Sequence, residues 1–301
     1  MFSFFAIIFG YLLNIINNFV GNYGLAIILF TIIIKLIMLP LSVKQQKTMK
    51  KSAKLQEKMK VLQFKYKNEP EKLNKEMMAL YKSENMSPFS GCLSALIQFI
   101  LLISIFYMVR YPLTYMKKID KDNINTYVTQ LQEDGKSVSQ AYSEIDILRE
   151  LDYLKEMNPE DENLEKINLN MKFFGLDLSK IPQQNLVDWT VYIIPILYIV
   201  STFISMRLTT SMQNKNKKEK NDEVIDITEK DENKEEKPEE KNEMEDAMAQ
   251  SNKMMSWMMP IMSVSISLVA PLGLALYWLM NNLLMILERL VLNKVLKDEK
   301  D

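Results

Sequence analysis

One lysine stands inside an otherwise apolar run, LFTIIIKLIMLPL at 29–41. Thr31 and Lys35 are four residues apart, so on a helix they share one face. Lys35 precedes the next lysine, Lys44, by about 14 Å along a helix axis at 1.5 Å per residue. A lysine side chain reaches only roughly 6 Å. Lys35 is therefore either a side chain that snorkels towards the interface or, the interpretation we favour, a cation in a hydrated pocket inside the membrane.

Three further apolar segments carry polar side chains that share a helical face. The first segment carries Ser94 with Gln98, and the second carries Ser201 with Ser205. The third carries two such groups, Tyr277 with Asn281 and Glu288, and Trp278 with Asn282 and Arg289. Such groups are costly against lipid and normally face a bundle interior or a water-filled cavity. The sequence thus predicts helices that turn polar rows inward.

The residue inventory argues against most enzyme chemistry. The chain has no histidine and a single cysteine, Cys92, so it lacks Ser-His and Cys-His pairs, disulfides and multi-cysteine metal sites. No G-x-x-x-x-G-K-S/T phosphate-binding motif occurs. We therefore expect a protein that is not an enzyme and that uses no metal and no cofactor.

Long apolar blocks alternate with blocks that are mostly charged, although the 301 residues have a net charge of only −1. This pattern is typical of a membrane protein with soluble loops. Residues 1–20 lack the basic start and the small-x-small cleavage site of a signal peptide. Their apolar face, with asparagines offset from it, predicts an extracytoplasmic interfacial helix, and an uncleaved extra span is the alternative.

Five membrane spans are predicted from apolar length, at 1.5 Å per residue and a hydrocarbon core of about 30 Å. The last apolar block, 254–287, carries no charge and is too long for one crossing. Pro271 and Gly273 divide it, because proline cannot continue the helical hydrogen bonds. The predicted spans are 21–43, 87–113, 187–208, 254–270 and 272–292.

The charges of the loops predict the orientation. Residues 44–86 hold twelve lysines and five acids, whereas 114–186 hold nine basic residues and fourteen acids. The positive-inside rule places 44–86 in the cytoplasm and 114–186 outside, which leaves the N-terminus outside and the tail 293–301 inside. The charged loop 209–253 is predicted to be a disordered cytoplasmic tether.

Residues 44–86 also show apolar side chains at near-helical spacing on both sides of Pro70. This pattern predicts a helical hairpin with an apolar seam and a lysine-coated exterior. The hairpin could recruit a partner or a nascent chain; docking of its lysines on the membrane surface is the alternative.

Several segments together resemble one family. Residues 255–282, MSWMMPIMSVSISLVAPLGLALYWLMNN, are similar to the last two spans of YidC-type membrane protein insertases, including the PLGL turn and the LYW sequence followed by Asn282. Residues 21–51 resemble that family's first span entering its cytoplasmic hairpin. SPFSGCLSALIQFILLISIFYMV resembles its second span, and FFGLDLSKIP resembles the outside segment before its third.

The resemblance implies an all-α integral protein of the bacterial cytoplasmic membrane, with five transmembrane helices around a hydrophilic groove, an N-terminal interfacial helix and a cytoplasmic helical hairpin. It implies an insertase and chaperone that moves short hydrophilic flanks of substrates across the membrane and releases their hydrophobic segments into lipid. The implied substrate groove comprises Lys35, Thr31, Gln98, Ser201, Ser205, Trp278 and Asn282. The implied recruitment hairpin carries Lys50, Lys51, Lys54 and Lys58.

The implied partners are nascent membrane proteins, the lipid bilayer, the Sec translocon and the ribosome, with no direct binding of nucleic acid. The chain departs from the family where Lys35 replaces the usual arginine, so bidentate carboxylate binding is lost. Ser205 and Glu288 stand where glutamine occurs in relatives. The alternative function, a small transporter or channel, predicts internal repeats and paired ionisable residues near the midplane. The sequence shows one deep cation and neither of these features.

Overall fold

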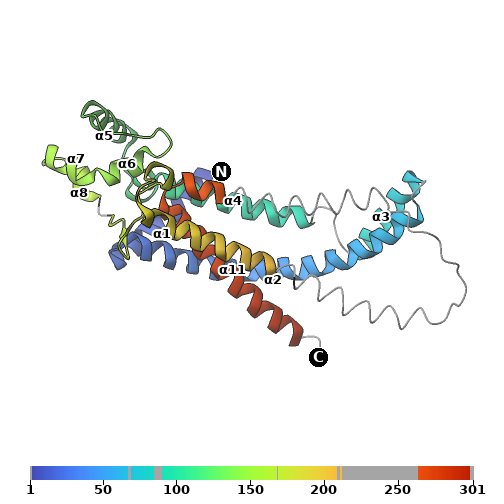
Figure 1. Cartoon of the computed structure of the whole chain (residues 1–301). Coiled ribbons are helices and arrows are strands. Elements are labelled where there is room, and N and C mark those ends of the chain that lie inside the picture. The colour runs from blue at the N-terminus through green and yellow to red at the C-terminus, as the bar shows by residue number, and fades with distance from the viewer. Residues whose placement is uncertain are drawn as a thin grey trace, which may run out of the picture. The chain divides into compact units, whose positions relative to one another are not determined.

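The computed structural model describes residues 2–66, 69–84, 90–167, 169–208, 211 and 264–298. The chain forms two compact units, Met1–Val20 with Leu29–Asn168 and Gly21–Ile28 with Leu169–Asp301. Within the described residues, every element except one two-stranded sheet is a helix (Figure 1). The helical class is therefore confirmed, whereas the count of five spans and the groove stay predictions.

The labelled elements follow in chain order. They are α1 (Phe2–Val20), α2 (Tyr23–Lys65), α3 (Pro70–Ser83), α4 (Ser90–Arg110), the π-helix η1 (Leu113–Lys117), α5 (Lys121–Glu133), α6 (Ser143–Arg149), α7 (Leu151–Met157), α8 (Glu162–Lys166), β1 (Lys172–Phe173), β2 (Leu176–Asp177), the 3₁₀ turns η2 (Pro182–Gln184) and η3 (Trp189–Tyr192), and α11 (Leu272–Asp298). Two further helices cover 193–208 and 264–269. The strands β1 and β2 pair antiparallel.

Helix α1 packs against α4 and η1 within the first unit. The helices approach so closely that a Cβ on Gly10 would lie 2.3 Å from the carbonyl oxygen of Tyr115. The ring of Phe9 meets Phe30 of α2 edge-on, with centroids 5.9 Å apart. The side of α1 turned away from these contacts exposes large apolar residues: Phe4, Ile7, Ile8, Tyr11, Ile15 and Phe19. Its placement at the membrane interface stays a prediction.

Four helices among the described residues are long and apolar enough to cross a membrane. They are Phe2–Val20, Tyr23–Thr48, Trp189–Leu208 and Leu272–Leu292, and the shorter helix Phe99–Arg110 is also apolar. A bend at Ala270 and Pro271 separates the helix 264–269 from α11, as the proline predicts. The rest of the predicted span 254–270, and nearly all of the loop 209–253, lie outside the described residues.

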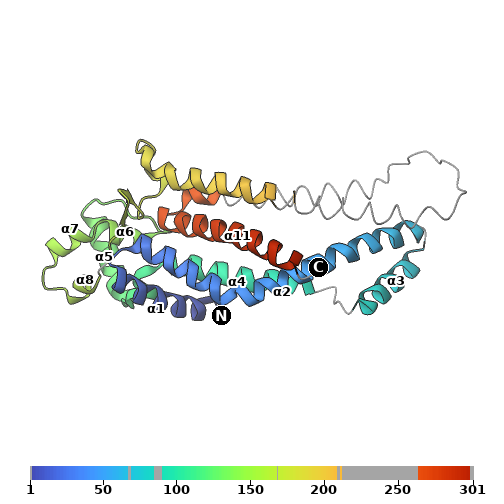
Figure 2. The same cartoon turned by 90° about the horizontal axis from the view of Figure 1, so that it is seen from below.

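Helix α2 runs without a break from the first predicted span into the predicted hairpin, and α3 supplies the returning arm. Proline at the first position of α3 suits a helix start, since its missing N–H would have no helical partner there. In both views this hairpin and the segment α5–α8 lie at opposite ends of the first unit (Figures 1 and 2).

Two charged side chains, Arg110 and Glu144, tie the segment between α4 and α8 to the end of α4 and to the start of η1. The Arg110 guanidinium donates to the carbonyl of Ala141 at 2.5 Å and lies over the rings of Tyr111 and Tyr142. In the opposite direction, the buried Glu144 of α6 accepts hydrogen bonds at the start of η1. Burial raises the pKa of Glu144 above its usual range, although these hydrogen bonds act to lower it.

Candidate functional site

The second unit brings together polar side chains from the helix 193–208 and α11. The Asn282 amide donates to the hydroxyl oxygens of Ser201, at 2.9 Å, and Thr202, at 3.1 Å. Both hydroxyls donate to the carbonyl of Tyr198, at 2.7 and 2.9 Å. Each hydroxyl thus uses its proton on its own helix and offers a lone pair to the neighbouring helix. The result is a neutral interhelical clamp in which Ser201 and Asn282 are buried.

Two more contacts extend this polar row along the same pair of helices. The ring of Trp278 lies against the ring of Tyr198, with centroids 6.1 Å apart. One turn beyond Ser201, the buried Ser205 accepts a long hydrogen bond of 3.5 Å from the Arg289 guanidinium. Arg289 adjoins Glu288 in sequence, so this end of the row carries both signs of charge. Four predicted groove residues are therefore neighbours in the structure: Ser201, Ser205, Trp278 and Asn282.

The remaining predicted groove residues belong to the first unit. Thr31 is fully buried, and Lys35, one turn further along α2, is half-buried. Gln98 lies on α4, and its side chain is outside the described part of the structure. Thr31 and Lys35 share a helical face as predicted from their spacing. That the two sets of residues line one groove stays a prediction.

The hairpin lysines are described in part. Lys51 and Lys58 of α2 are exposed, whereas the side chains of Lys50 and Lys54 lie outside the description. The Lys58 ammonium pairs with the Glu84 carboxylate just after α3, which joins the two arms of the hairpin. Both partners are largely exposed, so this pair contributes little to stability.

Sequence reasoning missed Thr202 and Tyr198 as members of the polar row. In this helix it followed Ser201 and Ser205, four residues apart, whereas Asn282 contacts two consecutive hydroxyls. The sequence did allow this prediction, since Ser and Thr in apolar helices donate to carbonyls three or four residues before them. Ser201 and Thr202 stand three and four residues after Tyr198, whose carbonyl they both reach.

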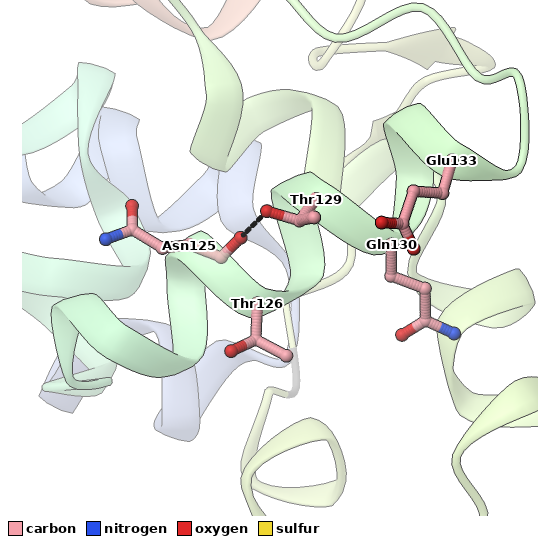
Figure 3. Close-up of a pocket in the computed structure, with 5 residues that line it drawn as sticks. All are labelled: Asn125, Thr126, Thr129, Gln130 and Glu133. Atoms are coloured by element: carbon pink, nitrogen blue, oxygen red, sulfur yellow. Dashed lines mark hydrogen bonds between the residues drawn. The ribbon is translucent and has the colours of Figure 1, made fainter.

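A shallow hollow on α5 offers no comparable chemistry. Figure 3 shows its lining, which is Asn125, Thr126, Thr129, Gln130 and Glu133. The hydroxyls of Thr126 and Thr129 donate to carbonyls of their own helix, at 2.9 Å each. Among the described residues, no group of three or more Cys, His, Asp or Glu side chains could hold a metal ion.

Long apolar helices that bury a few mutually bonded polar groups define a multi-pass helical membrane protein. The family model described as "60Kd inner membrane protein" matches residues 15–300. This chain therefore belongs to the 60Kd inner membrane protein family. The family resemblance inferred from the sequence motifs is confirmed by this match and by relatives that carry the name of that insertase.

Two relatives show how far the similarity extends. The chain is 29% identical over 286 residues to a membrane protein insertase YidC of Chlorobaculum parvum, which covers 95% of this chain and 35% of that protein. It is 48% identical over 109 residues to a membrane protein insertase YidC of Francisella tularensis subsp. novicida, covering 36% of this chain and 20% of that protein. The chain thus matches about a third of the first relative's length and a fifth of the second's.

Proposed function

We propose that this chain is a membrane protein insertase that moves short hydrophilic flanks of substrate proteins across the cytoplasmic membrane and releases their hydrophobic segments into lipid. The observation that carries the proposal is the family match across 15–300, together with relatives named as insertases. The working part is a hydrophilic groove with Lys35 as its cation. Thr31, Gln98, Ser201, Ser205, Trp278 and Asn282 complete its lining.

The chemistry of the groove follows from the cost of moving charge into hydrocarbon. An acidic flank of a substrate meets a high barrier in an apolar layer, and a nearby ammonium lowers that barrier by Coulomb attraction. Lys35 is half-buried on a helix whose flanking residues are apolar, so the attraction there is screened less than at the surface. The hydrophobic segment of the substrate then partitions into lipid without nucleotide hydrolysis.

The remaining parts of the proposal concern topology and partners. The lysine-rich loop 44–86 and the C-terminal tail lie in the cytoplasm, and 114–186 lies outside. The exposed lysines of the α2–α3 hairpin contact nascent membrane proteins before insertion, and the Sec translocon and the ribosome are further partners. The exposed positions of Lys51 and Lys58 support this role.

The test is an insertion assay in proteoliposomes that contain the full chain. A small substrate with an acidic tail is presented, and translocation of the tail is scored by protease protection. Wild type and Lys35→Arg should insert it, whereas Lys35→Glu should lower translocation by roughly tenfold, since about 1.4 kcal/mol of lost attraction corresponds to that factor. Lys44→Glu is the matched control, because Lys44 is an exposed lysine of the same helix.

Each outcome of the assay has a defined meaning. Equal insertion by Lys35→Glu and wild type would remove Lys35 from the mechanism while leaving the insertase function in place. A wild type that translocates nothing would contradict the insertase proposal. Ion flux through the same proteoliposomes would then test the alternative, a small transporter or channel.

A further inference from the structure

Four apolar side chains of the second unit are unusually exposed, and together they are called the apolar rim here. Their exposed fractions are 87% for Phe174, 69% for Leu186, 100% for Val187 and 72% for Trp189. Large apolar groups gathered in neighbouring segments mark a surface that contacts something other than water.

Phe174 is the most informative of these residues, because its backbone is strained as well. It forms the two-residue turn between β1 and β2 with Gly175, and both have positive φ, 49° and 80°. This geometry favours Asn, Asp or Gly at the first position, since a side chain there crowds the following carbonyl. A phenylalanine thus occupies a position that strains its backbone and leaves its ring uncovered. Such an outlier indicates a role for the ring itself.

Hydrogen bonds to backbone carbonyls tie this hairpin to the N-terminal ends of α2 and α11. The side-chain amide of Asn22, the residue just before α2, donates to the carbonyl of Lys172 at 2.7 Å, and the N–H of Gly273 donates to the carbonyl of Leu178 at 2.9 Å. Next to them, a Cβ on Gly24 would lie 2.4 Å from the ring of Phe173. The residue just after β2 therefore satisfies a helix-start donor of α11 that would otherwise lack a partner, and the hairpin is held at the ends of two candidate spans.

The other rim residues continue directly into an exposed apolar strip of the following helix. Trp189 is the first residue of the candidate span Trp189–Leu208. The exposed apolar side chains of that span follow from it: Ile196, Leu197, Val200, Phe203 and Ile204. The ammonium of Lys180 pairs with the carboxylate of Asp188 at 2.7 Å, which ties the segment after the hairpin to the start of the span. The rim is thus continuous with the apolar surface that this candidate span leaves exposed.

We propose that the apolar rim inserts into the interfacial layer of the bilayer, with Phe174 and Trp189 as aromatic anchors that fix the depth of the ends of α2, α11 and the span Trp189–Leu208. Aromatic rings favour this layer, because their apolar bodies leave water while their edges stay near the headgroups. The proposal depends on the membrane location of the chain and not on its insertase activity.

Spin-label accessibility in phosphatidylcholine vesicles tests the anchor. Cys92→Ser removes the native thiol, and a nitroxide is attached to Phe174→Cys or, as the matched control, to Gln184→Cys, an exposed polar position of η2. For each label, the measured quantity is the ratio of its collision rate with oxygen to its collision rate with a water-soluble nickel complex. This ratio should be several-fold higher for the label at 174 than for the label at 184. Equal ratios would overturn the proposal, and so would a label at 174 that neither reagent reaches, since protein would then cover it.

A second variant removes the ring and keeps the turn. Phe174→Asn suits the left-handed backbone, so the hairpin should persist and helicity by circular dichroism should not change. The substitutions Trp257→Phe and Trp278→Phe leave Trp189 as the only tryptophan of the sequence, so the fluorescence reports on this residue alone. Loss of the Phe174 ring should shift the Trp189 emission to longer wavelength and increase its quenching by iodide. An unchanged Trp189 signal would contradict a shared anchoring role.

Discussion

Two regions of the molecule bury polar side chains, and they do so with different chemistry. At the junction of α6 and η1, the buried carboxylate of Glu144 accepts from the N–H groups of Leu113 and Thr114, at 2.7 and 3.0 Å, and from the Thr114 hydroxyl at 2.6 Å. Between the helix 193–208 and α11, the buried group is the neutral amide of Asn282, which reaches two hydroxyls.

The difference follows from which backbone groups are available. A helix start leaves N–H donors without helical partners, so the beginning of η1 can donate hydrogen bonds to a buried carboxyl group. In the middle of a helix every backbone N–H is already bonded to a carbonyl, and only side chains remain as partners. A neutral amide can be satisfied by two hydroxyls, whereas a carboxylate in the same place would lack donors. The buried carboxylate of Glu144 thus lies beside a helix start, whereas the buried amide of Asn282 lies within a candidate span.

Removal of the carboxylate breaks the charged side of this comparison and should have the largest effect. Glu144→Ala removes the acceptor of the buried Leu113 N–H and of the part-buried Thr114 N–H, and an unsatisfied buried donor costs roughly 1–3 kcal/mol. We expect the segment α5–α8 to detach from η1, which limited proteolysis in detergent would show as early cleavage within 121–167. Glu144→Gln is the control, because its carbonyl oxygen can accept from both N–H groups while its amide donates to the Thr114 hydroxyl. Equal resistance of Glu144→Ala and wild type would refute the role of this contact.

The neutral clamp should be weaker, and a double-mutant cycle measures it. Asn282→Ala, Ser201→Ala and the double variant are compared by thermal unfolding in detergent. Hydrogen bonds between membrane helices average about 0.6 kcal/mol, because the unfolded state within the membrane also finds partners. A coupling energy near that value would sharpen the contrast with Glu144. A coupling above about 3 kcal/mol would abolish the contrast, and a value of zero would show that the clamp is only a packing contact.

The sequence predicted the parts of this molecule that depend on local pattern. The alternation of apolar and charged blocks predicted the membrane helices, and Pro271 predicted the break before α11, because helical hydrogen bonding and lipid burial act over neighbouring residues. The spacing of Ser201 and Ser205 predicted a shared face that the contacts to α11 confirm. These are consequences of helix geometry alone.

What the sequence did not predict depends on contacts between distant residues. Glu144 is one of fourteen acids in 114–186, and nothing in the local sequence distinguishes it from the acids of that segment that are exposed. Its role comes from the start of η1, thirty residues earlier in the chain. Likewise, Gly10 and Tyr115, which are 105 positions apart in the sequence, approach each other closely. Helix α2 also passes the predicted border at 43–44 without a break, because the charged stretch that follows has helical propensity of its own.

A third polar contact, at the edge of the span Trp189–Leu208, gives the smallest expected effect. A hydrogen bond from the Lys180 ammonium, with others from the hydroxyl and N–H of Thr190, lowers the pKa of Asp188 to about 2. A lowered pKa means that the charged contact stabilises the fold fully above the unfolded value of about 4 and loses this contribution as the pH falls towards 2. The fluorescence of Trp189, next in the chain, should therefore change between these pH values.

Asp188→Asn should flatten that transition, and Lys180→Gln should move it to higher pH by removing the largest cause of the shift. The effect on overall stability should be small, because water reaches both partners and screens the pair. If Asp188→Asn instead destabilised the chain as much as Glu144→Ala, exposure to solvent would not determine how much a charged contact contributes to the free energy of unfolding. The division between solvated pairs, carboxylates at helix starts and neutral amides within the spans would then need a different physical basis.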